Sequence, residues 1–391
     1  MTSAYSTIAR LAELADHPQA YAQDWRSRRH GKVIGTFPMN FPTELVHASG
    51  ALPTIIQEDR APITAGRSML YEFYCAYTRS ISAQAVTSKL DFVDGFFFVD
   101  HCISLIGAVD AMRYALPDKP IFLAQFIASM DEPWSEPVVR KKIESLLSQL
   151  RDFTGATISS EDLSNSIRAV NRNRRLLRQI YALRRTGRTQ LTSRQMQALV
   201  KSSMVMDIDE HNDIVAGLVE ALEQDAETAP GLVRLHLSGH FCHAPKPELL
   251  DVIEECGAVV VDDDLYTGFR HVSTDVPEDG DPVDALARWY MDRNVTVPCA
   301  TRVQNDVDWD AYLLQSLKES GAAGVIVLMA KFCEPHMLYY PELRKALDRS
   351  EIPHLLIETE HEGVPLEAIR THVETFLERI RRGAAPSLAT A

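Results

Sequence analysis

In Phe92-Val-Asp-Gly-Phe-Phe-Phe-Val-Asp-His-Cys102, an apolar run ends almost directly at a cysteine. A second run has the same form, Gly324-Val-Ile-Val-Leu-Met-Ala-Lys-Phe-Cys333. Each run is rich in β-branched or aromatic residues and precedes a helical pattern, which predicts a buried strand of a parallel sheet. A cysteine just beyond such a strand lies at the carboxyl edge of the sheet, where α/β folds bind their ligands.

A third cysteine, Cys75, lies in Tyr71-Glu-Phe-Tyr-Cys-Ala-Tyr, on the segment that we expect to form the helix leading to the strand before Cys102. Three thiolates that meet at one sheet edge would suit an iron–sulfur cluster in which one iron has no protein ligand. Free cysteine is also a common small core residue, and the chain has no Cys-x-x-Cys motif. The pattern therefore leaves a purely structural role open for each cysteine.

Three further cysteines are less informative. Cys256 precedes Gly257 at an expected helix C-terminus, which predicts a packing role. Cys242 and Cys299 fall in expected loops and stay unassigned.

Length, composition and charge narrow the class of protein. A chain of 391 residues predicts two or three domains, and 46% hydrophobic residues are enough for well-filled cores. No run approaches the roughly 20 apolar residues of a membrane helix. The N-terminus lacks the charged and apolar regions of a secretory signal, so we expect a cytoplasmic protein whose cysteines are ligands or core residues rather than disulfides. A net charge of −14 argues against a nucleic-acid partner but leaves room for an anionic small ligand.

The same order of elements occurs twice along the chain. A strand, a proline-containing loop, a helix, a glycine and a second strand are expected from Val33 to Ile56 and again from Leu232 to Val261. Gly50 and Gly257 end the two helices in this pattern. We therefore predict an α/β fold with two Rossmann-like or flavodoxin-like parallel-sheet domains that face each other across a cleft, and with Cys102 and Cys333 in corresponding positions.

Between the two copies the pattern changes to helical periodicity with abundant charge. We expect a helical arm at residues 1–30, a first α/β domain at 31–131, an additional helical segment at 132–226 and a second α/β domain at 227–391. The stretch from Arg172 to Arg185 is strongly basic on one face. It is either a solvated helix face or a surface for a coenzyme phosphate or an acidic partner.

An ordered set of motifs resembles the catalytic subunits of class I benzoyl-CoA reductases and the related 2-hydroxyacyl-CoA dehydratases. The resemblance covers about Val33 to Phe376. It is carried by Phe41-Pro-Thr-Glu-Leu-Val-His-Ala-Ser-Gly-Ala-Leu-Pro, Asp94-Gly-Phe-Phe-Phe-Val-Asp-His-Cys, Lys331-Phe-Cys-Glu-Pro, Pro341-Glu-Leu-Arg-Lys-Ala-Leu and Ile352-Pro-His-Leu-Leu-Ile-Glu.

The resemblance implies a cofactor and its ligands. Family members bind an iron–sulfur cluster through three cysteines at these motifs, which assigns Cys75, Cys102 and Cys333 and leaves out the other three. Many members have an aspartate after the last of these cysteines, where this chain has Glu334, and this difference should not affect the thiolate ligand. The expected cofactor is a [4Fe-4S] cluster, with an extended double-cubane cluster as the alternative.

The resemblance also implies a function and partners. We expect an oxygen-sensitive, ferredoxin-linked enzyme that uses ATP to dearomatise benzoyl-CoA. Neither Gly-x-x-x-x-Gly-Lys-Ser/Thr nor Gly-x-Gly-x-x-Gly occurs in the chain, so ATP-hydrolysing activator subunits must be separate chains, alongside a homologous catalytic subunit. The alternatives are a 2-hydroxyacyl-CoA dehydratase subunit, a double-cubane reductase of small molecules, and a non-enzymatic structural or electron-relay subunit.

Histidines near the cysteines are candidate proton donors, because such a reduction needs protons as well as electrons. His101 adjoins Cys102 and His336 follows Cys333 closely, so we name these two. His240 and His243 flank Cys242. A single loop histidine is more often a hydrogen-bonding or surface residue.

Overall fold

The computed structural model describes residues 2–224, 227–228 and 231–384. Two four-stranded sheets form its centre, and all strand pairs in both sheets are parallel. The first sheet has the order β2-β1-β3-β4 and comprises β1 (Val33–Thr36), β2 (Leu52–Ile55), β3 (Gly95–Val99) and β4 (Ile121–Ala124). The second has the order β6-β5-β7-β8 and comprises β5 (Val233–Gly239), β6 (Ala258–Asp263), β7 (Gly324–Ala330) and β8 (His354–Thr359).

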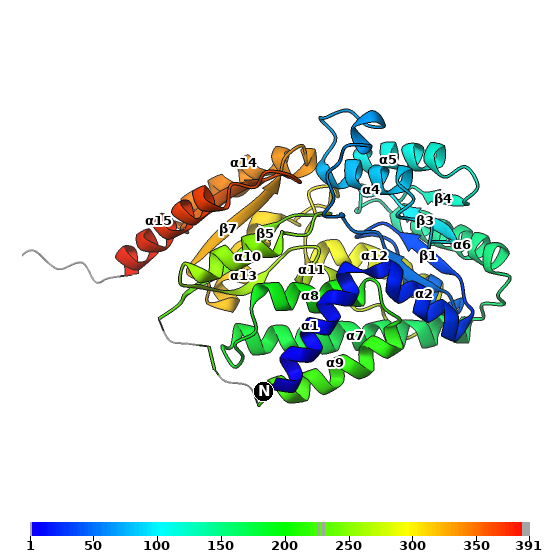
Figure 1. The fold of residues 1–391 in the computed structure, drawn as a ribbon, viewed down its shortest axis with the longest axis horizontal. Helices are drawn as coiled ribbons and strands as arrows, with labels where there is room; N and C mark the ends of the chain where they lie inside the picture. Colours follow the sequence, from blue (N-terminus) through cyan, green and yellow to red (C-terminus); the bar gives the residue numbers. More distant parts are fainter. Residues whose placement is uncertain (1, 225–226, 229–230, 385–391) are drawn as a thin grey trace, which may run out of the picture.

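The two strand orders match position by position, which confirms two parallel-sheet domains of similar topology. β3 and β7 are equivalent interior strands, and each is buried along its whole length. Burial on both faces requires the apolar runs from which these strands were predicted. Figure 1 shows the two sheets side by side, with β5 and β7 on the left and β1 and β3 on the right.

Helices connect the strands and cover the sheets. In the first half of the protein, which holds the sheet of β1 to β4, the helices are α3 (Glu44–Ala48), the short 3₁₀ turn Gly66–Ser68, α4 (Ala76–Val86) and α5 (Ile103–Ala115). In the second half, which holds the sheet of β5 to β8, they are α10 (Pro247–Glu255), α11 (Phe269–Val272), α12 (Pro282–Thr296), α13 (Trp309–Ser320), α14 (Glu334–Arg349) and α15 (Leu366–Ala384). Gly50 and Gly257 have positive φ angles of 73° and 95°, as expected for the residues that end α3 and α10.

The N-terminal and middle parts of the chain are helical. They comprise α1 (Thr2–Asp16), α2 (Pro18–Arg29), α6 (Ser135–Thr154), α7 (Ser160–Arg185), α8 (Ser193–Ser203) and α9 (Ile208–Leu222). Capping boxes begin α7 at Ser159 and α8 at Thr192. The domain limits at residues 30 and 131 stay predictions, and the limit at 226 lies outside the described residues. None of the helices in the described part of the chain combines the length and apolar character that a membrane span requires.

The basic face of α7 is largely used inside the chain. Arg178 pairs with Asp275 at 2.9 Å, and Arg185 pairs with Asp262 of β6 at 2.8 Å. Arg174 is buried and pairs with Glu44 of α3 at 2.8 Å. The acidic partner of this face is therefore the protein itself, and α7 braces elements of both halves (Figure 1).

Candidate functional site

Each of the three predicted cluster cysteines occupies the N-cap position of a helix. Cys75 precedes α4, Cys102 lies between β3 and α5, and Cys333 lies between β7 and α14. The amide N–H groups of a first helical turn have no partner within the helix and carry the positive end of its dipole. Against each sulfur lies the backbone N–H of the residue three positions further on, and these residues are Thr78, Leu105 and His336.

The structure brings the three thiols together across the boundary between the halves. Burial, and then the nearby Cys75, raise the pKa of the Cys102 thiol to about 12. The pKa of the Cys333 thiol is also raised, first by burial and then by Cys75 and Cys102. Charges in a poorly solvated interior influence one another over several ångströms, so the three thiols lie in the same buried region. Cys75 and Cys102 belong to the first half and Cys333 to the second, so the site exists only when both halves are in position.

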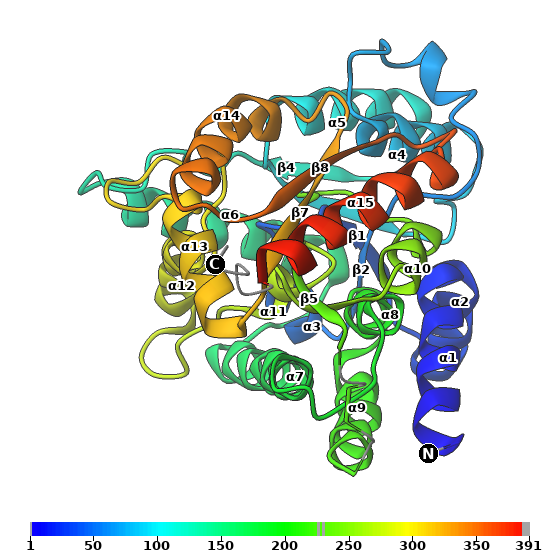
Figure 2. The same cartoon turned by 90° about the vertical axis from the view of Figure 1, so that its left-hand side faces the viewer.

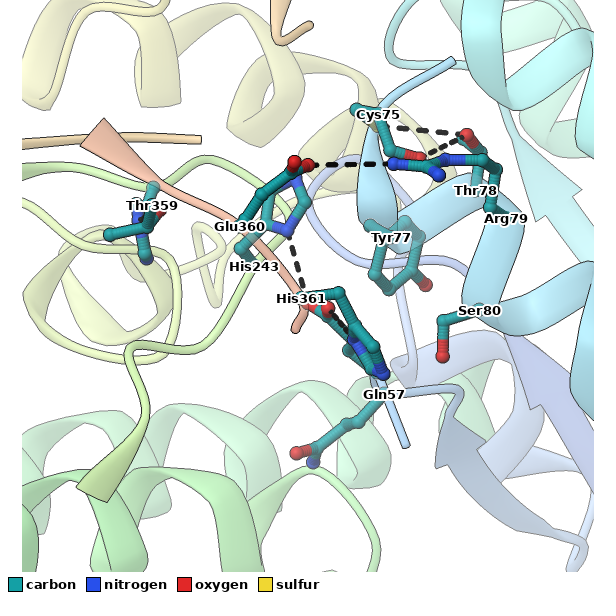
Figure 3. Close-up of polar contacts among 12 residues, drawn as sticks. Gln57, Cys75, Tyr77, Thr78, Arg79, Ser80, His243, Thr359, Glu360 and His361 are labelled. Carbon is teal, nitrogen blue, oxygen red and sulfur yellow. Dashed lines mark hydrogen bonds and ion pairs between the residues drawn. The ribbon is translucent and has the colours of Figure 1, made fainter. Parts of the chain in front are cut away.

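Cys75 differs from the other two cysteines. Burial would raise the pKa of its thiol, but the influence of the neighbouring His243 imidazole outweighs burial, and the pKa is lowered. The hydroxyl of Thr78 lies 3.6 Å from the same sulfur (Figure 3). Of these three cysteines, Cys75 is therefore the one that its surroundings most favour as a thiolate.

These residues fit an iron–sulfur cluster better than a single metal ion. Among residues 2–224, 227–228 and 231–384, no group of three or more His, Cys, Asp or Glu side chains is arranged to hold one metal ion. A cluster does not require such convergence, because each thiolate binds a different iron. Three thiols at three helix N-termini also provide amide donors for the negative charge of a thiolate-bound cluster.

Two cysteines that the sequence left unassigned also lie near this site. Burial raises the pKa of the Cys242 thiol, and Cys102, Cys75 and Cys333 raise it further. Cys299 is buried, yet the neighbouring His101, Arg270 and Thr301 together outweigh burial and lower its pKa to about 5. Cys242 follows β5 by three residues, so the sheet-edge rule applied to Cys102 would have found it. Cys256, by contrast, caps the end of α10, and its sulfur lies 3.9 Å from the Arg370 carbonyl of α15, which fits the predicted packing role.

His101 lies in a polar pocket between the halves. Its Nδ1 is 3.4 Å from the amide nitrogen of Asn40 and 3.4 Å from the hydroxyl of Thr301. Its Nε2 is 3.8 Å from the sulfur of Cys299. The ring is buried and held by side chains from both halves of the chain.

His336 has different surroundings. Its ring packs against Phe241 and Trp309, with centroid distances of 5.3 and 5.1 Å. It is fully buried, and in the described structure neither ring nitrogen has a hydrogen-bond partner. Burial lowers its pKa to about 4, so the ring is neutral at pH 7.

A cavity of about 200 Å³ lies beside Cys75, where the strands of both sheets end. Glu58, after β2, contacts two histidines of the second half, His243 and His361. Arg79 of α4 pairs with Glu360, after β8, at 3.5 Å (Figure 3). All five side chains follow strand ends or line the N-terminal part of α4. The sequence drew attention to His243, which flanks Cys242, but not to the other four.

Comparisons with known proteins show relatives that match along nearly the whole chain. The family model for "2-hydroxyglutaryl-CoA dehydratase, D-component" matches residues 38–380. A benzoyl-CoA reductase subunit of Thauera aromatica is 26% identical over 370 residues, which cover 92% of this chain and 94% of that protein. The (R)-2-hydroxyglutaryl-CoA dehydratase beta subunit of Acidaminococcus fermentans is 24% identical over 361 residues, covering 89% and 92%. The (R)-phenyllactyl-CoA dehydratase beta subunit of Clostridium sporogenes is 23% identical over 368 residues, covering 94% and 97%.

Proposed function

This chain belongs to the 2-hydroxyglutaryl-CoA dehydratase, D-component family, and we propose that it is the iron–sulfur catalytic subunit of an ATP-dependent, cytoplasmic benzoyl-CoA reductase. The proposed reaction dearomatises benzoyl-CoA, or a close analogue, to a cyclic dienoyl-CoA. The observation that carries the proposal is that Cys75, Cys102 and Cys333 each stand at a helix N-terminus, near enough to one another that Cys75 influences the pKa of the other two thiols. Similarity to a benzoyl-CoA reductase subunit supports this substrate class.

Cys75, Cys102 and Cys333 are the residues that hold the proposed [4Fe-4S] cluster, and a double-cubane cluster is the alternative. When bound, such a cluster supplies single electrons of low potential. The chain holds three sulfurs in place on rigid helix ends and directs backbone N–H groups at them. Buried aromatic side chains nearby, among them Tyr77, Phe241 and Trp309, keep water away from the sulfurs.

His101 and His336 are the proposed proton donors. His101 has the better support, because Asn40, Thr301 and Cys299 contact its two ring nitrogens and so fix its orientation. The ring of His336 lies between Phe241 and Trp309 and lacks polar contacts in the described structure, which gives this second assignment less support.

Exposed apolar side chains beside the cysteines support an assembly with other chains. Large apolar residues are exposed next to each of the three, and they are Tyr71, Phe73, Ile103, Phe332, Met337 and Leu338. Apolar residues grouped in this way are typical of protein interfaces. We propose that a homologous catalytic subunit and ATP-hydrolysing activator subunits bind here, with ferredoxin as the indirect electron source.

The second candidate is a subunit of a 2-hydroxyacyl-CoA dehydratase. The family description and the relatives from Acidaminococcus fermentans and Clostridium sporogenes favour it. The same three cysteines would hold the cluster in either enzyme, so the two candidates differ in the substrate and in the net reaction, which is reduction of a ring in one and loss of water in the other. A small-molecule reductase with a double-cubane cluster is the third candidate.

The test is an assay of the native complex, purified without oxygen. With ATP and a strong one-electron donor, we expect benzoyl-CoA to be consumed and a cyclic dienoyl-CoA to form. Consumption of a 2-hydroxyacyl-CoA alone supports the dehydratase. If neither ester reacts while iron and sulfide are present, the small-molecule reductase is favoured.

A further inference from the structure

Glu58 fixes two imidazole rings at the boundary between the halves. Its Oε2 accepts a hydrogen bond from Nδ1 of His243 at 3.0 Å, and its Oε1 contacts Nδ1 of His361. Nε2 of His361 donates to the carbonyl of Ala61 at 2.7 Å, so that ring is held at both nitrogens. All three side chains are nearly buried, and His361 lies below His243 in Figure 3.

The second nitrogen of His243 has a different neighbour. Within the described residues, Nε2 is buried and forms no hydrogen bond. Besides Glu58, the ring lies near the Cys75 thiol and near the ring of His240, whose centroid is 5.8 Å away. The ring of Tyr77 packs edge-on against the imidazole, with a centroid distance of 6.1 Å. A buried N–H without a partner is unfavourable, and a charged sulfur would satisfy it.

We propose that His243 donates an N–H hydrogen bond to the Cys75 sulfur and thereby raises the reduction potential of the bound cluster, with Glu58 as the residue that positions His243. An N–H donor draws negative charge from a cluster sulfur and so stabilises the reduced form, which is the more negative one. Because Glu58 engages Nδ1, Nε2 is the nitrogen left to face the sulfur. This inference rests on the proposed function, since it requires a cluster on Cys75.

The arrangement singles out one of the three ligands. Cys75, Cys102 and Cys333 each lie near a backbone N–H group of their own helix, which lowers the pKa of the thiol. Cys75 adds a side chain from the opposite half of the chain, 168 residues away in sequence when counted from position 75 to 243. The charge on the Cys75 sulfur, in the first half, therefore depends on where the loop that carries His243 lies in the second half.

The first experiment uses the metal-free chain and tests the contact alone. Nitrogen NMR of ¹⁵N-labelled histidine should show the Nε2 signal of His243 shifting on Cys75→Ala, while the signals of His361 stay in place. An unchanged His243 signal would overturn the hydrogen bond, whatever the chain does with iron.

The second experiment measures the midpoint potential of the reconstituted protein, after equal iron content has been verified. His243→Phe should shift the reduction equilibrium about tenfold toward the oxidised form, which is 59 mV for a one-electron couple. Glu58→Gln should shift it in the same direction, and His243→Gln, which keeps an N–H donor, should restore part of the difference. His361→Phe is the matched control, because it removes the other imidazole on Glu58 without facing Cys75.

The outcomes separate this inference from the proposed function. A wild-type potential in His243→Phe, or an equal shift in His361→Phe, overturns the tuning role while leaving the cluster assignment intact. If the wild-type chain binds no iron, the proposed function and the tuning role are both wrong. The NMR result then still decides whether His243 contacts Cys75.

Discussion

A sulfur stands at the N-cap of three helices in this protein, where serine, threonine, aspartate or asparagine are the usual residues. Cysteine is a weak acceptor and offers the helix little in return, so its presence at all three positions points to a use other than capping. Metal ligation is that use in our proposal. The same amides that lack a partner inside each helix then face a charged sulfur.

At the residue scale, we predict that Cys75→Ala, Cys102→Ala and Cys333→Ala each remove most of the bound iron, because a cluster that loses one thiolate is poorly held. Iron and sulfide analysis of each anaerobically reconstituted variant is the measurement. Cys256→Ala is the matched control and should keep its iron, since its sulfur lies against the Arg370 carbonyl of α15. Full iron occupancy in Cys333→Ala would show the assignment to be wrong.

At the scale of elements, the carboxyl end of β5 is closely packed against β7 and α14. Gly239 has a φ angle of 107°, which favours glycine. A Cβ atom there would lie 2.4 Å from the carbonyl oxygen of Leu328 and 2.5 Å from the ring of His336. The tight approach of these elements brings the Cys333 helix close to the loop that carries His243.

We therefore predict that Gly239→Ala destabilises the protein by about 2 kcal/mol or more, through a backbone clash and a strained φ angle. Urea unfolding of the metal-free chain measures the change in free energy of unfolding. Gly217→Ala offers the opposite case, because Gly217 lies in α9 with no atom within 4 Å of its Cβ position. Alanine there should stabilise by about 1 kcal/mol through its higher helix propensity. Equal effects from the two substitutions would contradict the close packing around Gly239.

At the scale of the whole molecule, the proposed cluster joins two halves that each supply ligands. α4, α5 and α14 lie along the same side of the molecule in both views (Figures 1 and 2). The arginines of α7 and the Glu58 contacts hold the halves together without metal. The fold should therefore survive metal removal, whereas the helix ends at the boundary should loosen.

This gives a prediction for iron removal from the loaded protein. Amide hydrogen exchange should increase at the first turns of α4, α5 and α14 and change little in β1, β3, β5 and β7, because only the helix ends lose a ligand. The same chelator treatment of Cys333→Ala should have no effect, since that variant lacks the iron. A uniform increase along the chain would contradict a local role of the metal at the boundary.

The exposed apolar side chains lead to a second prediction at this scale. Leu338 is 80% exposed in the first turns of α14. Leu338→Asp should leave the unfolding midpoint and iron content unchanged and should abolish copurification with the homologous subunit, because a charge in an apolar interface is costly. Tyr114→Asp is the control, since Tyr114 is 81% exposed at the far end of α5 from Cys102. If Leu338→Asp retains the complex, α14 does not belong to the interface.

The local sequence pattern alone was enough to predict much of the fold of this protein. Apolar runs predicted β3 and β7, and the repeated order of elements predicted two sheets of equal topology, because burial on both faces imposes a continuous apolar run on a parallel strand. The position of Cys102 and Cys333 after those strands followed directly. Helical periodicity likewise predicted a helical segment at 132–226, where α6 to α9 lie.

Only the tertiary structure decided which distant side chains meet. Glu58 contacts His361 across 303 residues, and His101 lies near Cys299 across 198. The basic face of α7 could have faced solvent or a phosphate, and packing placed Asp262 and Asp275 against it instead. Periodicity along a chain records which face of an element is buried but not what buries it. The elements that bury a given face are set by how the loops and layers pack in the folded chain. In this protein, that packing places His243 of the second half near Cys75 of the first half.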